Sequence, residues 1–149
     1  MTVEEMVGLL NDDLRNEYKH MHFYLHAAAV VEGVERFWLS KLLREHAESE
    51  LEHCLQFSTK IRSYGGYPIQ GWQAKCCDTV ETARDILRYA LCMEQEVVDN
   101  YKVRRQQAEE LGDTALVLFI EEQIEDSQHD VDELKIAVGD SLRRVRESV

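Results

Sequence analysis

Glu50 and His53 have the residue types and the spacing that metal binding requires. Three positions apart on a helix, they leave the same face one turn apart, so a carboxylate and an imidazole could bind one ion. Glutamate-rich helices also contain Glu-x-x-His by chance, with both side chains in solvent. Here the pair shares its face with His46 and with the apolar residues Leu39, Leu42, Leu43, Phe57, Ile61 and Tyr64. A carboxylate buried on such a face must be paired, protonated or bound to a metal.

Two more acids lie in the middle of apolar helical lines, Glu17 in the first half of the chain and Glu94 in the second. Tyr24 follows Glu17 by seven positions, and Tyr101 follows Glu94 by the same spacing. The two halves therefore resemble each other, and each is expected to direct one acid into the core.

The other part of this repeat is less regular. Asp126 and His129 match the spacing of Glu50 and His53, on a face that also carries acids. That face could bind metal or be solvated, because a second, apolar line on the same helix could be the buried side instead. This line consists of Ile120, Ile124, Val131 and Val138. The repeat favours the ligand interpretation, and the apolar line would then cover another subunit.

Start and stop signals predict two long helices in the first half. A capping box at residues 2–5 opens a helix that runs to about Val31. The next helix covers about residues 34–64 and ends at the sequence Gly-Gly-Tyr-Pro of residues 65–68. Glycine permits left-handed backbone and proline cannot continue a helix, so this stop is sharp.

The second half predicts two more helices. A capping box at residues 78–81 opens the third, which ends at Leu111. Gly112 and Asp113 combine a stop with an N-cap, so the fourth helix turns back at once and covers residues 114 to about 138. Residues 141–149 are a candidate for a short fifth helix.

A long connection up to Cys77 separates the second and third helices and shows no regular period. It lets the third helix start at the opposite end of the molecule. The expected fold is all-α, an up-down-down-up four-helix bundle formed by one domain over residues 1–149. Its four inward acids and two histidines suit a pair of iron or manganese ions, with zinc as another occupant.

Composition narrows the classes of function. The net charge is −12, from 29 acidic and 17 basic residues, which disfavours nucleic acid and anionic membranes as partners. No apolar run approaches the length of a membrane span, and residues 1–5 do not resemble a signal peptide. The four cysteines form no Cys-x-x-Cys pair and are expected to be reduced thiols. A cytoplasmic location follows from these features as an expectation.

The ligand pattern from Glu17 to His129, including the turn at residues 65–68, resembles that of ferritin-like diiron proteins and is closest to bacterioferritin. The resemblance implies Glu17 and Glu94 as terminal ligands and Glu50 and Asp126 as bridging ligands. It implies that His53 and His129 each bind one of two irons per chain. Outer-shell candidates are Tyr24, Tyr101, His46, Gln123 and Glu125.

Three features depart from the family pattern. Asp126 stands where the family has Glu, so Glu125 is an alternative bridging ligand. Leu51 replaces the haem-binding Met of bacterioferritins, so no haem is expected. The segment after His129 is short for a ferritin, which leaves the subunit number open between a dimer and a closed cage.

The activity implied by the resemblance is a ferroxidase, which oxidises Fe(II) with dioxygen or hydrogen peroxide for iron storage or detoxification. A rubrerythrin-like oxidase or peroxidase without storage is an alternative, although Val97 replaces the extra Glu of that group. A non-enzymatic helix bundle with acids paired to Arg is another, but Arg105 alone among the candidate arginines lies near an inward face.

Overall fold

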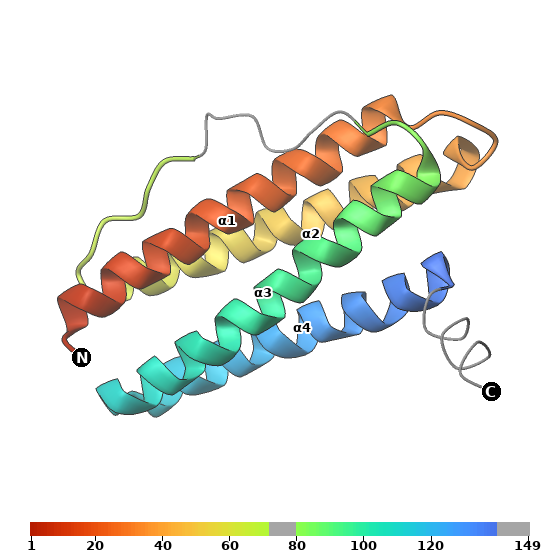
Figure 1. Cartoon of the computed structure of the whole chain (residues 1–149). Coiled ribbons are helices and arrows are strands. Elements are labelled where there is room, and N and C mark those ends of the chain that lie inside the picture. The colour runs from red at the N-terminus through yellow and green to blue at the C-terminus, as the bar shows by residue number, and fades with distance from the viewer. Residues whose placement is uncertain (72–79, 140–149) are drawn as a thin grey trace, which may run out of the picture. The chain divides into compact units, whose positions relative to one another are not determined.

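The computed structural model describes residues 1–71 and 80–139. They form four long helices, α1 (Val3–Val30), α2 (Arg36–Ser63), α3 (Ala83–Leu111) and α4 (Thr114–Val138) (Figure 1). The predicted all-α, four-helix class is therefore confirmed. The chain consists of two compact units, Met1–Ala83 and Arg84–Val149.

Helices α1 and α2 form the first unit and lie side by side as an antiparallel hairpin (Figure 1). The predicted capping box starts α1, since Thr2 accepts from the Glu5 amide and the Glu5 carboxylate accepts from the Thr2 amide. The Arg36 guanidinium at the start of α2 donates to the carbonyls of Ala29 and Val31, each at 2.9 Å. These bonds satisfy carbonyls that the end of α1 leaves without helical partners.

Glycines close this unit beyond α2. Gly65 has a φ of +80°, and the Gly66 amide donates to the Ile61 carbonyl at 3.1 Å. A Cβ on Gly66 would lie 2.6 Å from a Val7 methyl group, so a side chain here would push against α1. The Asn11 side chain then bonds the backbone of Tyr67 and Ile69. The tip of the second helix is thereby fixed against the first turns of α1.

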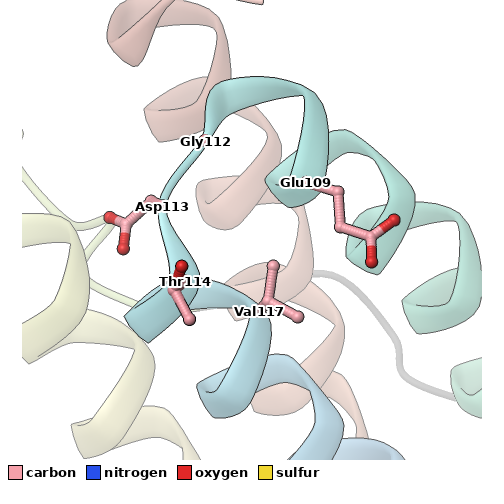
Figure 2. Close-up of a pocket in the computed structure, with 5 residues that line it drawn as sticks. All are labelled: Glu109, Gly112, Asp113, Thr114 and Val117. Carbon is pink, nitrogen blue, oxygen red and sulfur yellow. The ribbon is translucent and has the colours of Figure 1, made fainter.

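Helices α3 and α4 form the second unit, joined by the tight turn at Gly112 that the sequence predicted. The Asp113 carboxylate accepts from the Leu116 amide at 3.0 Å and so caps α4. Arg105 on α3 donates to Glu121 on α4 at 2.7 Å and to Glu109 at 2.8 Å. The turn borders a shallow pocket of about 230 Å³, where the side chains of Glu109 and Asp113 point in different directions (Figure 2).

Two helix starts differ from the prediction. α2 begins at Arg36 because Gly33 has a φ of +98°, which ends the turn before it. α3 begins at Ala83, since Glu81 and Thr82 pair as extended backbone with Glu32. Asp78 and Thr79 of the predicted capping box, and the predicted fifth helix, lie outside the described residues. Among the described helices, none has a segment apolar and long enough to span a membrane.

Candidate metal centre

Glu17 on α1 and Glu50 and His53 on α2 meet inside the first hairpin. One ligand atom from each lies within 4.8 Å of the other two. The His53 Nδ1 atom is 3.2 Å from Glu50 Oε2 and 3.5 Å from Glu17 Oε2. Their relative exposures are only 2%, 3% and 7% for Glu17, Glu50 and His53. The helical spacing of three therefore does bring Glu50 and His53 together, and α1 supplies the second carboxylate.

The two carboxylates hold a proton on His53. Burial by itself lowers the pKa of this imidazole, but hydrogen bonds and charges from Glu17 and Glu50 outweigh burial and raise the pKa to about 11. Burial likewise raises the pKa of Glu17, yet its hydrogen bonds with Glu50 and His53 and the charges of His20 and His53 lower it to about 2. In the metal-free protein His53 is thus an imidazolium beside the ionised Glu17 carboxylate.

This donor set fits a divalent transition metal. Two carboxylate oxygens and one imidazole nitrogen are hard and borderline ligands that iron, manganese and zinc accept. Burial removes competing water, while the proton on His53 occupies the position that a cation would take. In the described chain, the charges that stabilise ionised Glu17 come from the two imidazoles of His20 and His53. The cluster therefore has the composition of a metal site.

Tyr24 on α1 and His46 on α2 pack beside each other in the first hairpin. Tyr24 is 1% exposed, and its ring stacks on His46 with centroids 5.0 Å apart and an interplanar angle of 22°. The rings of Phe23 and Tyr24 pack edge to face, with centroids 5.3 Å apart. Tyr24 shares the buried face of α1 with Glu17, two turns away. Its predicted outer-shell role, like that of His46, stays a prediction.

In the second unit, Glu94 and Tyr101 lie on the buried face of α3, with exposures of 1% and 3%. The sequence predicted that both side chains point inward, and this placement is what the structure has. The assignment of Glu94 as a metal ligand and of Tyr101 as an outer-shell residue stays a prediction.

Helix α4 differs from the expectation. Glu125, Asp126 and His129 are exposed, and the polar residues on the buried side are Gln123 and Ser127. Gln123, predicted as an outer-shell residue, is 3% exposed. The apolar line on the buried side includes Ile120, Val131 and Val138, with Ile124 half-buried. This line is covered within the chain, so the expectation that it covers another subunit was wrong. The buried side carries an amide and a hydroxyl where the repeat had predicted a carboxylate and an imidazole.

Sequence reasoning missed His20. The side chain is 7% exposed and lies on the buried face of α1, one turn after Glu17. The signal was available, because Glu17 and His20 have the same Glu-x-x-His spacing as Glu50 and His53. Cys54, next to His53 in sequence, is also buried, at 2% exposure.

A family model for the ferritin-like domain matches residues 7–142. The chain belongs to the ferritin-like family. A ferritin-like, diiron-carboxylate protein from Bacillus anthracis is 32% identical, with a TM-score of 0.84 over 93% of this chain and 99% of that one. No curated protein matches the chain significantly in sequence.

Two more distant structures have the same ferritin-like fold. A bacterioferritin from Rhodobacter capsulatus is 23% identical, with a TM-score of 0.81 over 94% of this chain and 87% of that one. A dodecameric thioferritin from Bacteroides fragilis is 20% identical, with a TM-score of 0.84 over 99% and 92% of the two chains. Both proteins thus share the fold of this ferritin-like chain.

Proposed function

We propose that this ferritin-like protein is a ferroxidase, which binds Fe(II) at Glu17, Glu50 and His53 and oxidises it to Fe(III). The observation that supports this most directly is the buried cluster of two carboxylates and one imidazole with ligand atoms within 4.8 Å of one another. Carboxylates favour Fe(III), the harder cation, over Fe(II), and so assist the oxidation.

The acceptor in this proposal is dioxygen or hydrogen peroxide. Two Fe(II) ions give up one electron each, and dioxygen with two protons takes both electrons to become hydrogen peroxide. With hydrogen peroxide as the acceptor, the same two electrons and two protons yield two molecules of water. The chain's residues bind Fe(II) in a site from which bulk water is largely excluded, and His53 releases its proton when the cation enters.

Iron storage or detoxification in the cytoplasm is the proposed setting. The Bacillus anthracis relative is described as a diiron-carboxylate protein, which supports iron as the metal. The Bacteroides fragilis protein is dodecameric, which supports the proposal that this chain forms a homo-oligomer. The proposed oligomer is a dimer at least, and a closed cage is the larger alternative. We also expect no haem, because Leu51 offers no ligand atom and is 56% exposed.

Anaerobic titration of metal-free protein with Fe(II), followed by air, tests the proposal. The signal is the ultraviolet absorbance of oxo-bridged Fe(III). Wild type is expected to oxidise Fe(II) rapidly, and Glu50→Ala, His53→Ala to lose at least about 100-fold in rate, because the variant lacks two of three ligands. Glu52→Ala is the matched control, since Glu52 is an exposed neighbour on the same helix.

Equal, slow oxidation by wild type and the double variant would show that the ferroxidase proposal is wrong. In that case a non-enzymatic helix bundle becomes the better hypothesis for these buried charges. Fast oxidation that stops once the site is filled would favour a rubrerythrin-like oxidase or peroxidase, which keeps its iron. Continued uptake beyond that point would favour storage.

A further inference from the structure

His22 and His26 lie outside the buried cluster, on the solvent side of α1. His26 is exposed and His22 is half-buried, whereas Glu17 on the same helix is 2% exposed. The two imidazoles are four positions apart within one continuous helix. Residues with this spacing lie one turn apart on the same face, with Cβ atoms about 5–6 Å from each other. Both imidazoles can therefore reach one ion above the helix surface.

Side chains of α2 hold the end of α1 that follows this pair. The Ser40 hydroxyl donates to the Ala28 carbonyl at 2.7 Å, and the Arg36 guanidinium donates to the carbonyls of Ala29 and Val31. The end of a helix leaves such carbonyls without helical partners, so these bonds oppose fraying. An ion bound by both imidazoles thus meets a backbone that is already in place, which lowers the entropy cost of binding.

Two imidazoles at this spacing suit late first-row divalent metals. Helices bind Zn(II) through histidines four positions apart, and Cu(II) binds nitrogen ligands more tightly than the other ions of this row. Cu(II) and Ni(II) also accept a square of nitrogen and oxygen ligands. Water can supply the oxygen ligands, because His26 is exposed.

The charges around the pair are of both signs. Lys19, one turn before His22, repels a cation, whereas Arg15 is already paired with Asp12 at 3.0 Å. The net charge of −12 attracts cations to the protein as a whole. Lys19→Ala should therefore tighten the binding of a divalent ion by His22 and His26.

We propose that His22 and His26 form a separate surface site, which binds one late first-row divalent ion, Cu(II) most tightly. Its ligands are two imidazoles, whereas the buried cluster has two carboxylates and one imidazole. Because His26 is exposed, the bound ion exchanges with solvent. The site goes beyond the proposed function, since it shares no ligand with Glu50 and His53.

Titration of metal-free protein with Cu(II) tests the site, with electron paramagnetic resonance as the readout. Nitrogen couplings count the imidazoles bound to the ion, and the buried cluster supplies a single one. Wild type is expected to show a Cu(II) signal with two imidazoles. His22→Ala and His26→Ala should each lose that signal and bind the ion at least about tenfold more weakly, since even outer-shell partners of a metal contribute that much.

The matched control keeps the number of histidines but separates them. In His26→Ala, Gly8→His the two imidazoles are about 20 Å apart along the helix, too far for one ion. Gly8 is exposed and has open space around it, so a side chain fits there. This variant should lack the two-imidazole signal, as His26→Ala does. Circular dichroism checks that each variant keeps its helices.

Two results would overturn the proposal. One is a two-imidazole signal that persists unchanged in His22→Ala. The other is a wild-type spectrum with no more than one imidazole, which would leave both histidines as solvated side chains only. The ferroxidase proposal fails separately, on the oxidation rate of Glu50→Ala, His53→Ala, and that variant should keep the two-imidazole Cu(II) signal.

Discussion

His53 is positively charged in the metal-free protein because Glu17 and Glu50 flank it at 3.5 and 3.2 Å. Its raised pKa has a direct consequence for metal binding, since a cation must displace the proton. We expect Zn(II) binding at this site to release about one proton, so that affinity rises with pH up to about pH 11. Calorimetry in buffers of different ionisation enthalpy measures the proton count. Binding without proton release would show that His53 is neutral beforehand.

The same groups make the stability of the metal-free protein depend on pH. The pKa of His53 rises from 6.5 to about 11 on folding. Its contribution to the free energy of unfolding is therefore complete below pH 6.5 and is lost as pH rises through 11. The pKa of Glu17 falls from 4.5 to about 2, so its contribution is present above pH 4.5 and is lost as pH falls through 2. Both contributions are therefore complete between pH 4.5 and 6.5.

Urea unfolding at pH 3, 5.5 and 9 checks this expectation. The free energy of unfolding of the metal-free protein should be greatest at pH 5.5. In His53→Gln the decrease between pH 5.5 and 9 should be smaller, because the group that loses its proton is gone. An unchanged alkaline decrease in that variant would assign the effect to other residues.

Cys54 should be far less reactive than Cys92. Burial, followed by the charges of Glu17 and Glu50, raises the pKa of the Cys54 thiol to about 12, whereas Cys92 is exposed. We expect a thiol reagent at pH 8 to modify Cys92 rapidly and Cys54 only after unfolding. The rates are measured in a Cys76→Ser, Cys77→Ser background, where Cys54→Ser and Cys92→Ser identify the two remaining signals. Rapid modification of Cys54 in the folded protein would contradict its burial.

At the scale of the elements, turn and cap residues predicted the helices well. The bounds of α4 were predicted correctly from three residues. Gly112 ends α3, Asp113 caps the start of α4, and Gly139 ends α4. The start of α3 was predicted too early, because pairing of Glu81 and Thr82 with Glu32 keeps that segment extended. A long-range backbone contact of this kind leaves no local signal in the sequence.

The buried face of α4 differs most from the expectation. Two faces of this helix have the period of an amphipathic helix, one rich in acids and one apolar, so the pattern alone does not select between them. The repeat with Glu50 and His53 favoured the acidic face, whereas Gln123 and Ser127 lie on the buried one. Gln123 and Ser127 interrupt the apolar line, and this interruption made the buried face harder to identify from the sequence.

Asp113 is expected to contribute measurably to stability. Its carboxylate accepts from the Leu116 amide at 3.0 Å, one of the amides that the start of α4 leaves without a helical partner. Asp113→Ala should lower the free energy of unfolding by about 1 kcal/mol, while Asp113→Asn, which can still cap, should change it by less. Urea unfolding of wild type and the two variants measures these free energies. An alanine variant as stable as wild type would show that the cap does not contribute to stability.

At the scale of the whole molecule, the sequence predicted the number, order and lengths of the helices. It did so because five of the eight helix ends have a glycine or a side-chain cap, at Thr2, Gly65, Gly112, Asp113 and Gly139. The ligand cluster of Glu17, Glu50 and His53 could also be predicted, since acids within apolar lines are rare and conspicuous. His20 was missed, although it follows Glu17 with the spacing of a Glu-x-x-His pair, because His22 and His26 lie close to it in the sequence.

An exposed apolar line on α2 predicts where chains associate. Phe37, Leu51 and Leu55 are 93%, 56% and 60% exposed, and their spacing puts them on one side of the helix. Exposed apolar groups of this kind usually mark an interface. We expect Leu51→Glu, Leu55→Glu to dissociate the proposed homo-oligomer, as measured by light scattering. Leu118→Glu, at an equally exposed position on α4, should not dissociate it. An oligomer that survives the double substitution would place the interface elsewhere.

The proximity of Glu17, Glu50 and His53 in sequence bears on how the protein is made. All three precede residue 54, on two helices joined only by residues 31–35. The entropy cost of bringing them together is that of closing one short loop, and contacts of this kind form early. Because domains begin to fold from the N-terminal end during synthesis, these ligands can meet on the ribosome before α3 and α4 are translated. Under the proposed function, metal uptake can therefore precede completion of the polypeptide.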